Sequence, residues 1–259
     1  MTAQILHGRF GAPAPYYPNG RPSYADALIR RVVAHVALKR HHRALDIGTG
    51  PGQLAVAIAP YVREVVAIDP EPEMLKRARA NAEAANAPVS FIEASSNELG
   101  PPLGTFHLTT IGRAFHWTDR ADTLRRLDEI IEPGGAVALF KHAHPKVPEN
   151  RWTRDYDAVL DPYRAGDKAI ERGPDWLIHE AFLLESAFAS LERISVIERR
   201  RTPLQHFVDR ALSLGAVWHK LDPIEGQIEA ALLEALAPFT QDGAIHEVVE
   251  SEALIATRP

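Results

Sequence analysis

Between residues 43 and 141 the chain alternates short apolar segments with longer helical ones. The runs RALDI, EVVAID, VSFIEA, HLTTIG and AVALF have the length and β-branched content of buried strands. Between them, QLAVAIAPYV, EPEMLKRARANAEAAN and DRADTLRRLDEII carry apolar residues at helical spacing. Because parallel strands need crossover connections, this alternation predicts an α/β fold with a parallel sheet and helices on its faces.

The flanking segments differ from this core. Residues 1–22 are rich in Gly, Pro and aromatic residues and predict an extended segment, which a helix follows within 1–42. Residues 142–190 and 203–240 predict helices and loops that cap the sheet. The last two strands are expected within 191–202 and 245–259, with an antiparallel edge. We expect one domain over 1–259.

Composition excludes several classes of protein. A hydrophobic fraction of 46% in 259 residues is enough to fill a core, and the net charge of −5 argues against a nucleic-acid partner held by a broad basic surface. The run Arg199, Arg200 and Arg201 is flanked by acidic residues and predicts a solvated strand end. With no cysteine, disulfides, thiolate catalysis and cysteine-bound metals are excluded. No apolar run reaches ~20 residues and no secretory leader is evident, so we expect a cytoplasmic protein without membrane contact.

The segment from Arg43 to Asp69 is the most informative. A strand runs into Gly48, Gly50 and Gly52 and then directly into a helix. Glycines at such a turn let the backbone approach a ligand closely, and the helix N-terminus offers free N–H groups. The next strand ends at Asp69, where a carboxylate can accept hydrogen bonds from both hydroxyls of a ribose.

Two ligands compete for this layout, and a glycine turn without any ligand is a third possibility. Nicotinamide enzymes carry G-x-G-x-x-G, whereas this chain has G-x-G-x-G, with Gln53 where their third glycine would fall. Asp46, two residues before the first glycine, suits a cationic amino-acid group better than a pyrophosphate. These residues favour a nucleoside that carries an amino acid.

LDIGTGPGQLA and VVAIDPEPEML resemble the first two motifs of class I S-adenosylmethionine-dependent methyltransferases. FHLTTIGRAFHWTDRADTLRRLDEIIEPGGAVALF is similar to their fourth strand, crossover helix and turn. The His-Trp pair and the Tyr…Arg-Pro-x-Tyr segment resemble the small-molecule enzymes among them, including the trans-aconitate methyltransferase-like group. The resemblance implies a Rossmann-like, seven-stranded, mostly parallel sheet with helices on both faces and a helical cap insertion that forms the acceptor site. It also implies that the N-terminal segment closes over the cofactor as a lid, although that segment could merely pack on the surface.

The resemblance implies the residues that would contact S-adenosylmethionine. They are Tyr17, Arg21, Asp46, Gly48, Thr49, Gly50, Gln53, Asp69, Pro70, Met74, Ser95, Ser96 and Arg113. The chain departs from the family near Ser95 and Ser96, where an acidic residue is common. It also has Phe106-His107 where relatives have Phe-Asp, which removes a carboxylate expected near the rim of the site.

Methyl transfer from a sulfonium needs positioning more than acid–base chemistry, yet a hydroxyl acceptor benefits from a general base. His116, past the fourth strand, is the candidate catalytic residue; alternatively it orients a loop or contacts the cofactor. His142 and His144 could face the acceptor, His219 is a weaker candidate, and His41 and His42 are expected to be solvated. No ligand spacing predicts a metal site.

The expected activity is methylation of a small molecule, on oxygen more than on nitrogen, by a monomer or homodimer. The alternatives are a non-catalytic regulatory protein that binds S-adenosylmethionine and, with less support, a nicotinamide-dependent oxidoreductase.

Overall fold

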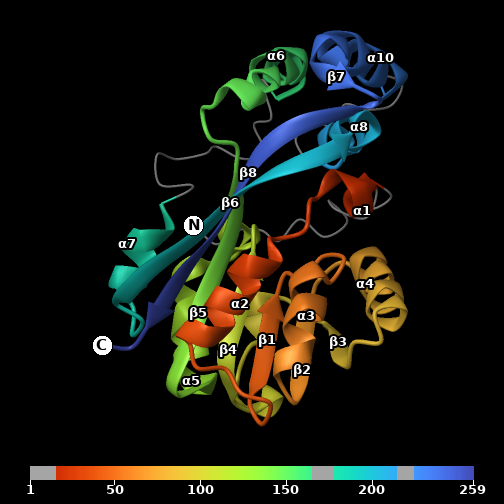
Figure 1. Cartoon of the computed structure of the whole chain (residues 1–259). Coiled ribbons are helices and arrows are strands. Elements are labelled where there is room, and N and C mark those ends of the chain that lie inside the picture. The colour runs from red at the N-terminus through yellow and green to blue at the C-terminus, as the bar shows by residue number, and fades with distance from the viewer. Residues whose placement is uncertain (1–15, 165–177, 215–224) are drawn as a thin grey trace.

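The computed structural model describes residues 16–164, 178–214 and 225–259, and its strands form one sheet (Figure 1). The strands are β1 (Arg43–Ile47), β2 (Glu64–Asp69), β3 (Val89–Glu93), β4 (Phe106–Gly112), β5 (Ile131–Ala143), β6 (Ser190–Pro203), β7 (Thr240–Gln241) and β8 (Ala244–Thr257). Their order is β3-β2-β1-β4-β5-β8-β6, with β7 beside β8. β1 to β5 pair in parallel, whereas β8 is antiparallel to both β5 and β6. The predicted Rossmann-like sheet is confirmed, with a two-residue eighth strand added.

Helices cover both faces of the sheet. The α-helices of the described residues are α1 (Tyr17–Gly20), α2 (Asp26–His35), α3 (Gln53–Ile58), α4 (Pro72–Ala84), α5 (Arg120–Ile130), α6 (Trp152–Arg164), α7 (His179–Leu184), α8 (Leu204–Leu212) and α10 (Glu225–Leu236). One buried cluster joins the apolar sides of α2 and α3 to the sheet, and a second joins α5 and α7 to the opposite face. These four helices therefore each bury an apolar side against the sheet, as expected of amphipathic helices.

The far ends of β6 and β8 extend beyond the parallel strands and carry a second lobe, made with α6, α8, α10 and β7 (Figure 1). This lobe has its own buried cluster, which includes Trp152, Phe207 and Leu232. At its base Glu247 has a fully buried side chain that contacts His144 at 2.9 Å and Arg210 at 3.3 Å. The helices expected after residues 142 and 203 thus gather mainly at one end of a long antiparallel hairpin.

Candidate functional site

The glycine loop between β1 and α3 has a backbone that only glycine adopts easily. Gly48, Gly50 and Gly52 have φ values of 62°, 53° and 83°. A Cβ on Gly48 would lie 2.5 Å from the Cβ of Ala114, whereas a Cβ on Gly50 would meet nothing within 4 Å. The loop is therefore packed against the β4 end at Gly48 and open at Gly50.

Asp69, at the end of β2, holds this loop from the side. Its Oδ2 accepts a hydrogen bond from the Gly50 N–H at 2.8 Å, and its Oδ1 accepts one from the Glu71 N–H at 3.0 Å. Burial raises the pKa of Asp69 to about 6, against the two N–H groups that favour its charge. A carboxylate has about four acceptor sites, so both oxygens retain capacity for hydroxyl donors of a ligand.

Asp46, near the end of β1, is almost completely buried. It accepts hydrogen bonds from the hydroxyls of Thr49 (2.5 Å) and Thr110 (2.7 Å). Burial raises its pKa to about 6, which the two hydroxyls oppose. These two hydrogen bonds join β1, the glycine loop and β4. Thr110 was missed by sequence reasoning because it is distant in the chain.

The segment before α2 crosses over the glycine loop. The Gln53 side chain donates to the Arg21 carbonyl at 2.6 Å, and the Arg21 guanidinium donates to the Ser213 carbonyl at 3.0 Å. Arg21 thereby links the loop to the end of α8 in the second lobe. Tyr17 belongs to α1, but its side chain lies outside the described part of the structure.

Arg113 follows β4 with an unusual φ of 56°, a conformation held by the hydrogen bond from its N–H to the Phe140 carbonyl at 3.1 Å. Its guanidinium carbon lies 5.7 Å from the ring centroid of Tyr24. The Tyr24 ring stacks on His142 at 4.3 Å. Backbone strain of this kind concentrates at functional sites, so Arg113 stands out at this edge of the sheet.

His142 is a neutral imidazole. Burial, followed by the charges of Arg113 and Arg200, lowers its pKa to about 2. The Ser23 backbone raises this pKa, but by less than the other groups lower it. Neither ring nitrogen has a hydrogen-bond partner of good geometry within the described residues. His142 therefore presents unsatisfied polar atoms close to the Arg113 and Tyr24 side chains.

The residues expected beside an adenine lie at the ends of β2 and β3. Met74 is buried in α4, and Pro70 precedes that helix. The Ser95 hydroxyl donates to the Glu98 carboxylate at 3.1 Å, which also accepts the Ser95 N–H at 2.7 Å. Ser96 is buried beside them. Ser95 thus caps its own turn, and an adenine contact from Ser95 or Ser96 stays a prediction.

His116 lies in a short 3-10 turn after β4. Its ring is parallel to that of His179, with centroids 6.3 Å apart, and Trp117 lies beside it at 5.0 Å. Burial and then Arg120 lower the pKa of His179. Sequence reasoning missed His179, because 63 residues separate it from His116.

Other histidine predictions have mixed outcomes. His144 contacts Glu247 in the base of the second lobe, and His219 lies outside the described residues. Position 107 was expected near the rim of the cofactor site, and this was wrong: His107 lies at the amino end of β4, away from that rim. His42 stacks on it at 3.8 Å and is only partly exposed. The structure therefore divides the histidines between both edges of the sheet.

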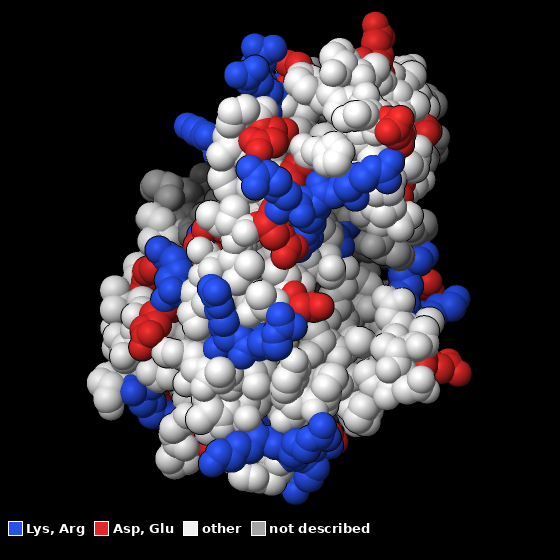
Figure 2. Space-filling model, viewed as in Figure 1, with Lys and Arg blue, Asp and Glu red and all other residues white. Residues whose placement is uncertain are grey.

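Charges at the surface are mixed. Arg199 is exposed and pairs with Glu149, as a solvated strand end predicts, whereas Arg200 pairs with Glu198 and its side chain is only 17% exposed. On the face shown in Figure 2 the basic side chains form groups separated by acidic and uncharged surface. No helix among the described residues is long and apolar enough to span a membrane.

Comparisons with known proteins give a consistent picture. Residues 44–135 match a family described as a methyltransferase domain. The chain is 28% identical to an uncharacterised methyltransferase of Mycobacterium tuberculosis over 63% of this chain and 62% of that protein. It is 37% identical to demethylmenaquinone methyltransferase of Thermus thermophilus over 47% of this chain and 57% of that protein.

The fold also matches solved structures. A methyltransferase of Thiobacillus denitrificans, determined in complex with S-adenosyl-L-homocysteine, aligns with a TM-score of 0.52 and 18% identity over 91% of this chain and 92% of that chain. At this identity the likeness establishes the fold. The chain spans less than two thirds of the length of the first curated relatives that it matches, between 62% and 64%.

Proposed function

We propose that this chain, whose residues 44–135 match a methyltransferase-domain family, is a class I S-adenosylmethionine-dependent methyltransferase. Its acceptor would be a small molecule, methylated on oxygen in preference to nitrogen. The observation that carries the proposal is the open glycine loop at Gly50, flanked by the buried carboxylates of Asp46 and Asp69. When bound, S-adenosylmethionine supplies an activated methyl group at a sulfonium.

The residues present fit this cofactor. The space beside Gly50 is open, so a ligand can approach the backbone of the loop closely there. Asp69 can still accept hydrogen bonds from ribose hydroxyls. The buried negative environment of Asp46 suits the cofactor's ammonium group, and the Arg113 guanidinium suits its carboxylate. Pro70 and Met74 follow Asp69 in the chain, and the adenine ring would lie beside them when Asp69 holds the ribose. Gln53 and Asp46 favour this cofactor over a dinucleotide.

The acceptor would lie between the β4 end and the residues that follow β5. His116 and His179 meet there from segments on either side of β5. The His116 imidazole would accept the proton that an acceptor hydroxyl loses on attack, and Trp117 would limit the access of water. The name of the Thermus relative, demethylmenaquinone methyltransferase, supports a small molecule as acceptor.

Calorimetric titration of the purified full chain with S-adenosylmethionine, S-adenosylhomocysteine and NADH tests the proposal. We expect micromolar binding of the first two ligands, at least tenfold weaker binding by Asp69→Ala, and unchanged binding by the exposed control Asp26→Ala. Gly50→Ala provides a second variant that keeps the Asp69 hydrogen bonds. Binding of NADH alone, or of none of the three, would overturn the methyltransferase proposal.

With the cofactor established, an acceptor screen by methyl transfer tests the role of His116. We expect His116→Ala to bind S-adenosylhomocysteine normally and to lose the acidic limb of the pH–rate profile. An unaltered profile would remove His116 as base. Cofactor binding without any turnover across hydroxyl, carboxyl and amine acceptors would favour a regulatory role.

A further inference from the structure

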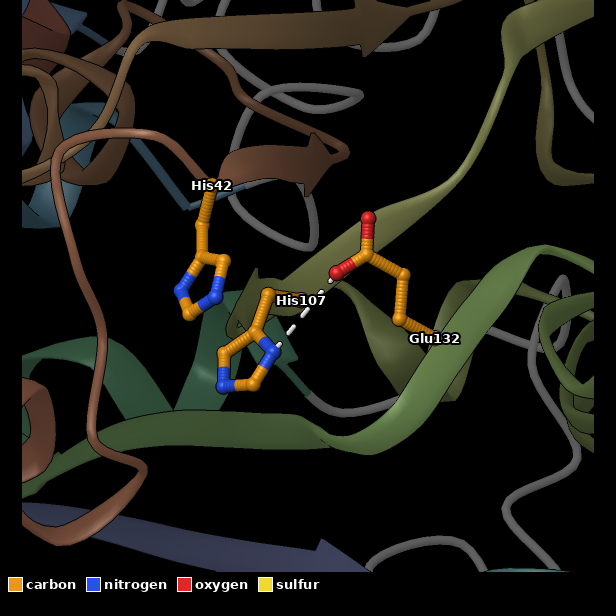
Figure 3. Close-up of side chains that lie close together, drawn as sticks. All are labelled: His42, His107 and Glu132. Atoms are coloured by element: carbon orange, nitrogen blue, oxygen red, sulfur yellow. Dashed lines mark ion pairs between the residues drawn. The ribbon is translucent and has the colours of Figure 1, made fainter.

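Three side chains converge at the amino edge of the sheet, opposite the glycine loop. His42 precedes β1, His107 lies at the start of β4, and Glu132 lies at the start of β5 (Figure 3). One ligand atom from each lies within 4.8 Å of the other two. Since 25 to 90 residues separate them in the chain, their meeting is a product of the fold.

His107 is oriented as a metal ligand would be. Its Nε2 lies 2.9 Å from the Val36 carbonyl, which can only accept, so Nε2 is the protonated nitrogen when the ring is neutral, the form in which imidazole binds metals. The lone pair of Nδ1 then faces Glu132 Oε2 at 3.7 Å, too far for a hydrogen bond. A lone pair opposite a carboxylate is repulsive, and a cation between them removes the repulsion. Histidine ligands of metals characteristically donate their other N–H to a carbonyl in this way.

Glu132 is held in a matching orientation. Its Oε1 accepts a hydrogen bond from the Thr105 hydroxyl at 3.2 Å, which leaves Oε2 directed at His107. The carboxylate is partly exposed, so ions can reach it from solvent. His107 and Glu132 thus form a two-ligand site in which each side chain is fixed by a separate hydrogen bond.

His42 can supply the third ligand once its ring has rotated. Figure 3 shows one of its ring nitrogens directed toward His107 and Glu132, while Nδ1 accepts the Lys39 N–H at 3.1 Å. The rings of His42 and His107 lie face to face, 13° from parallel, so His42 must turn to bring its lone pair between them. It lies in the turn before β1, where side-chain rotation and loss of the exposed Lys39 contact disturb no strand pairing.

We propose that His42, His107 and Glu132 bind a divalent ion of the zinc type, with solvent completing the coordination. Two imidazoles and one carboxylate suit such borderline ions, whereas Mg²⁺ and Ca²⁺ prefer oxygen ligands only. When two donor atoms bind one ion through bonds of about 2.0–2.2 Å, they lie close to the separation that His107 Nδ1 and Glu132 Oε2 already have. The ion would connect the entry into β1 with the starts of β4 and β5, a structural role independent of the proposed methyl transfer.

Titration of the untagged, chelator-treated full chain with ZnCl₂, followed by calorimetry, tests this site. We expect one saturable equivalent in the wild type and binding weaker by at least about tenfold in Glu132→Gln and in His42→Ala. Both substitutions are at partly exposed positions, which spares the fold. His41→Ala is the matched control, because it removes the adjacent exposed imidazole and should bind zinc like the wild type.

Thermal unfolding supplies a second readout. Zinc should raise the midpoint of the wild type and of His41→Ala but not that of Glu132→Gln, and MgCl₂ should raise none of them. Absence of saturable zinc binding would overturn the proposal. Equal zinc affinity in the wild type, Glu132→Gln and His42→Ala would also overturn it, because the ion would then bind elsewhere.

Discussion

Replacing Asp46 by Asn should stabilise the protein while weakening cofactor binding. The Asp46 carboxylate is about 1% exposed, and burial raises its pKa from 3.8 to about 6. Each pKa unit corresponds to about 1.4 kcal/mol, so ionised Asp46 costs the folded state about 3 kcal/mol at neutral pH. The Asn side chain has the same shape, and the hydroxyls of Thr49 and Thr110 can donate to its oxygen or accept from its amide.

The pH dependence follows from the direction of the shift. Because the folded pKa is raised, the contribution of Asp46 to stability is undiminished below pH 3.8 and is lost as the pH rises to about 6. The Asn variant does not titrate. Its advantage in free energy of unfolding should therefore grow from about 1.5 kcal/mol at pH 5 to about 3 kcal/mol at pH 8.

Urea unfolding followed by tryptophan fluorescence at pH 5, 6, 7 and 8 measures this difference. Asp26→Asn is the control: it removes an exposed carboxylate from the first turn of α2, where the helix dipole favours negative charge, so stability should fall by about 0.3–1 kcal/mol. An Asp46→Asn variant no more stable than the wild type at pH 8, or one whose advantage shrinks as the pH rises, would refute the reasoning.

Three further predictions concern single positions. Gly48→Ala should lose about 2–4 kcal/mol in urea unfolding, from positive φ plus overpacking, whereas Gly50→Ala should lose only about 1–2 kcal/mol; equal losses would contradict the difference in contacts. Burial opposes the ionisation of Glu247, but its hydrogen-bond and charge partners outweigh burial and lower its pKa to about 2. The contribution of Glu247 to the stability of the fold should therefore be present above about pH 4.5 and disappear as the pH falls toward 2. Glu247→Ala should then cost about 3–5 kcal/mol at pH 7, since Arg210 is left buried without its partner, and thermal melts should show a smaller difference at pH 3. His142→Phe should gain about 1–2 kcal/mol in urea unfolding by removing unsatisfied polar atoms, and a loss would imply a partner for this ring.

Local patterns predicted the architecture because the interactions behind them are local. The apolar runs between residues 43 and 141 specify strands by their own composition, and the helical periodicity between them places the crossovers. The glycines at 48, 50 and 52 require positive φ within one turn, so their role is readable without knowing any distant neighbour. Asp46 and Asp69 follow from their positions at strand ends.

Partnerships across the sheet could not be predicted in the same way. The contact of Thr110 with Asp46 depends on the β1–β4 register, and the approach of His179 to His116 depends on where α7 returns to the sheet. The residue types themselves give no signal, because threonine is common in strands and histidine is unremarkable at the start of a helix. Only the assembled sheet reveals which polar side chains become neighbours.

The two buried carboxylates connect stability with binding. Burial raises the pKa of both Asp46 and Asp69 to about 6, so at neutral pH the ligand-free loop holds two ionised groups with little solvent around them. An ammonium group near Asp46 and hydroxyl donors at Asp69 would each favour the ionised form, and binding would recover part of that free energy. Cofactor binding should therefore lower the apparent pKa of these groups and release protons, and the number released should fall toward zero as the pH rises from 6 to 8. Substitutions that neutralise either carboxylate relieve the same cost permanently, which is why a gain in stability and a loss of affinity should appear in the same variant.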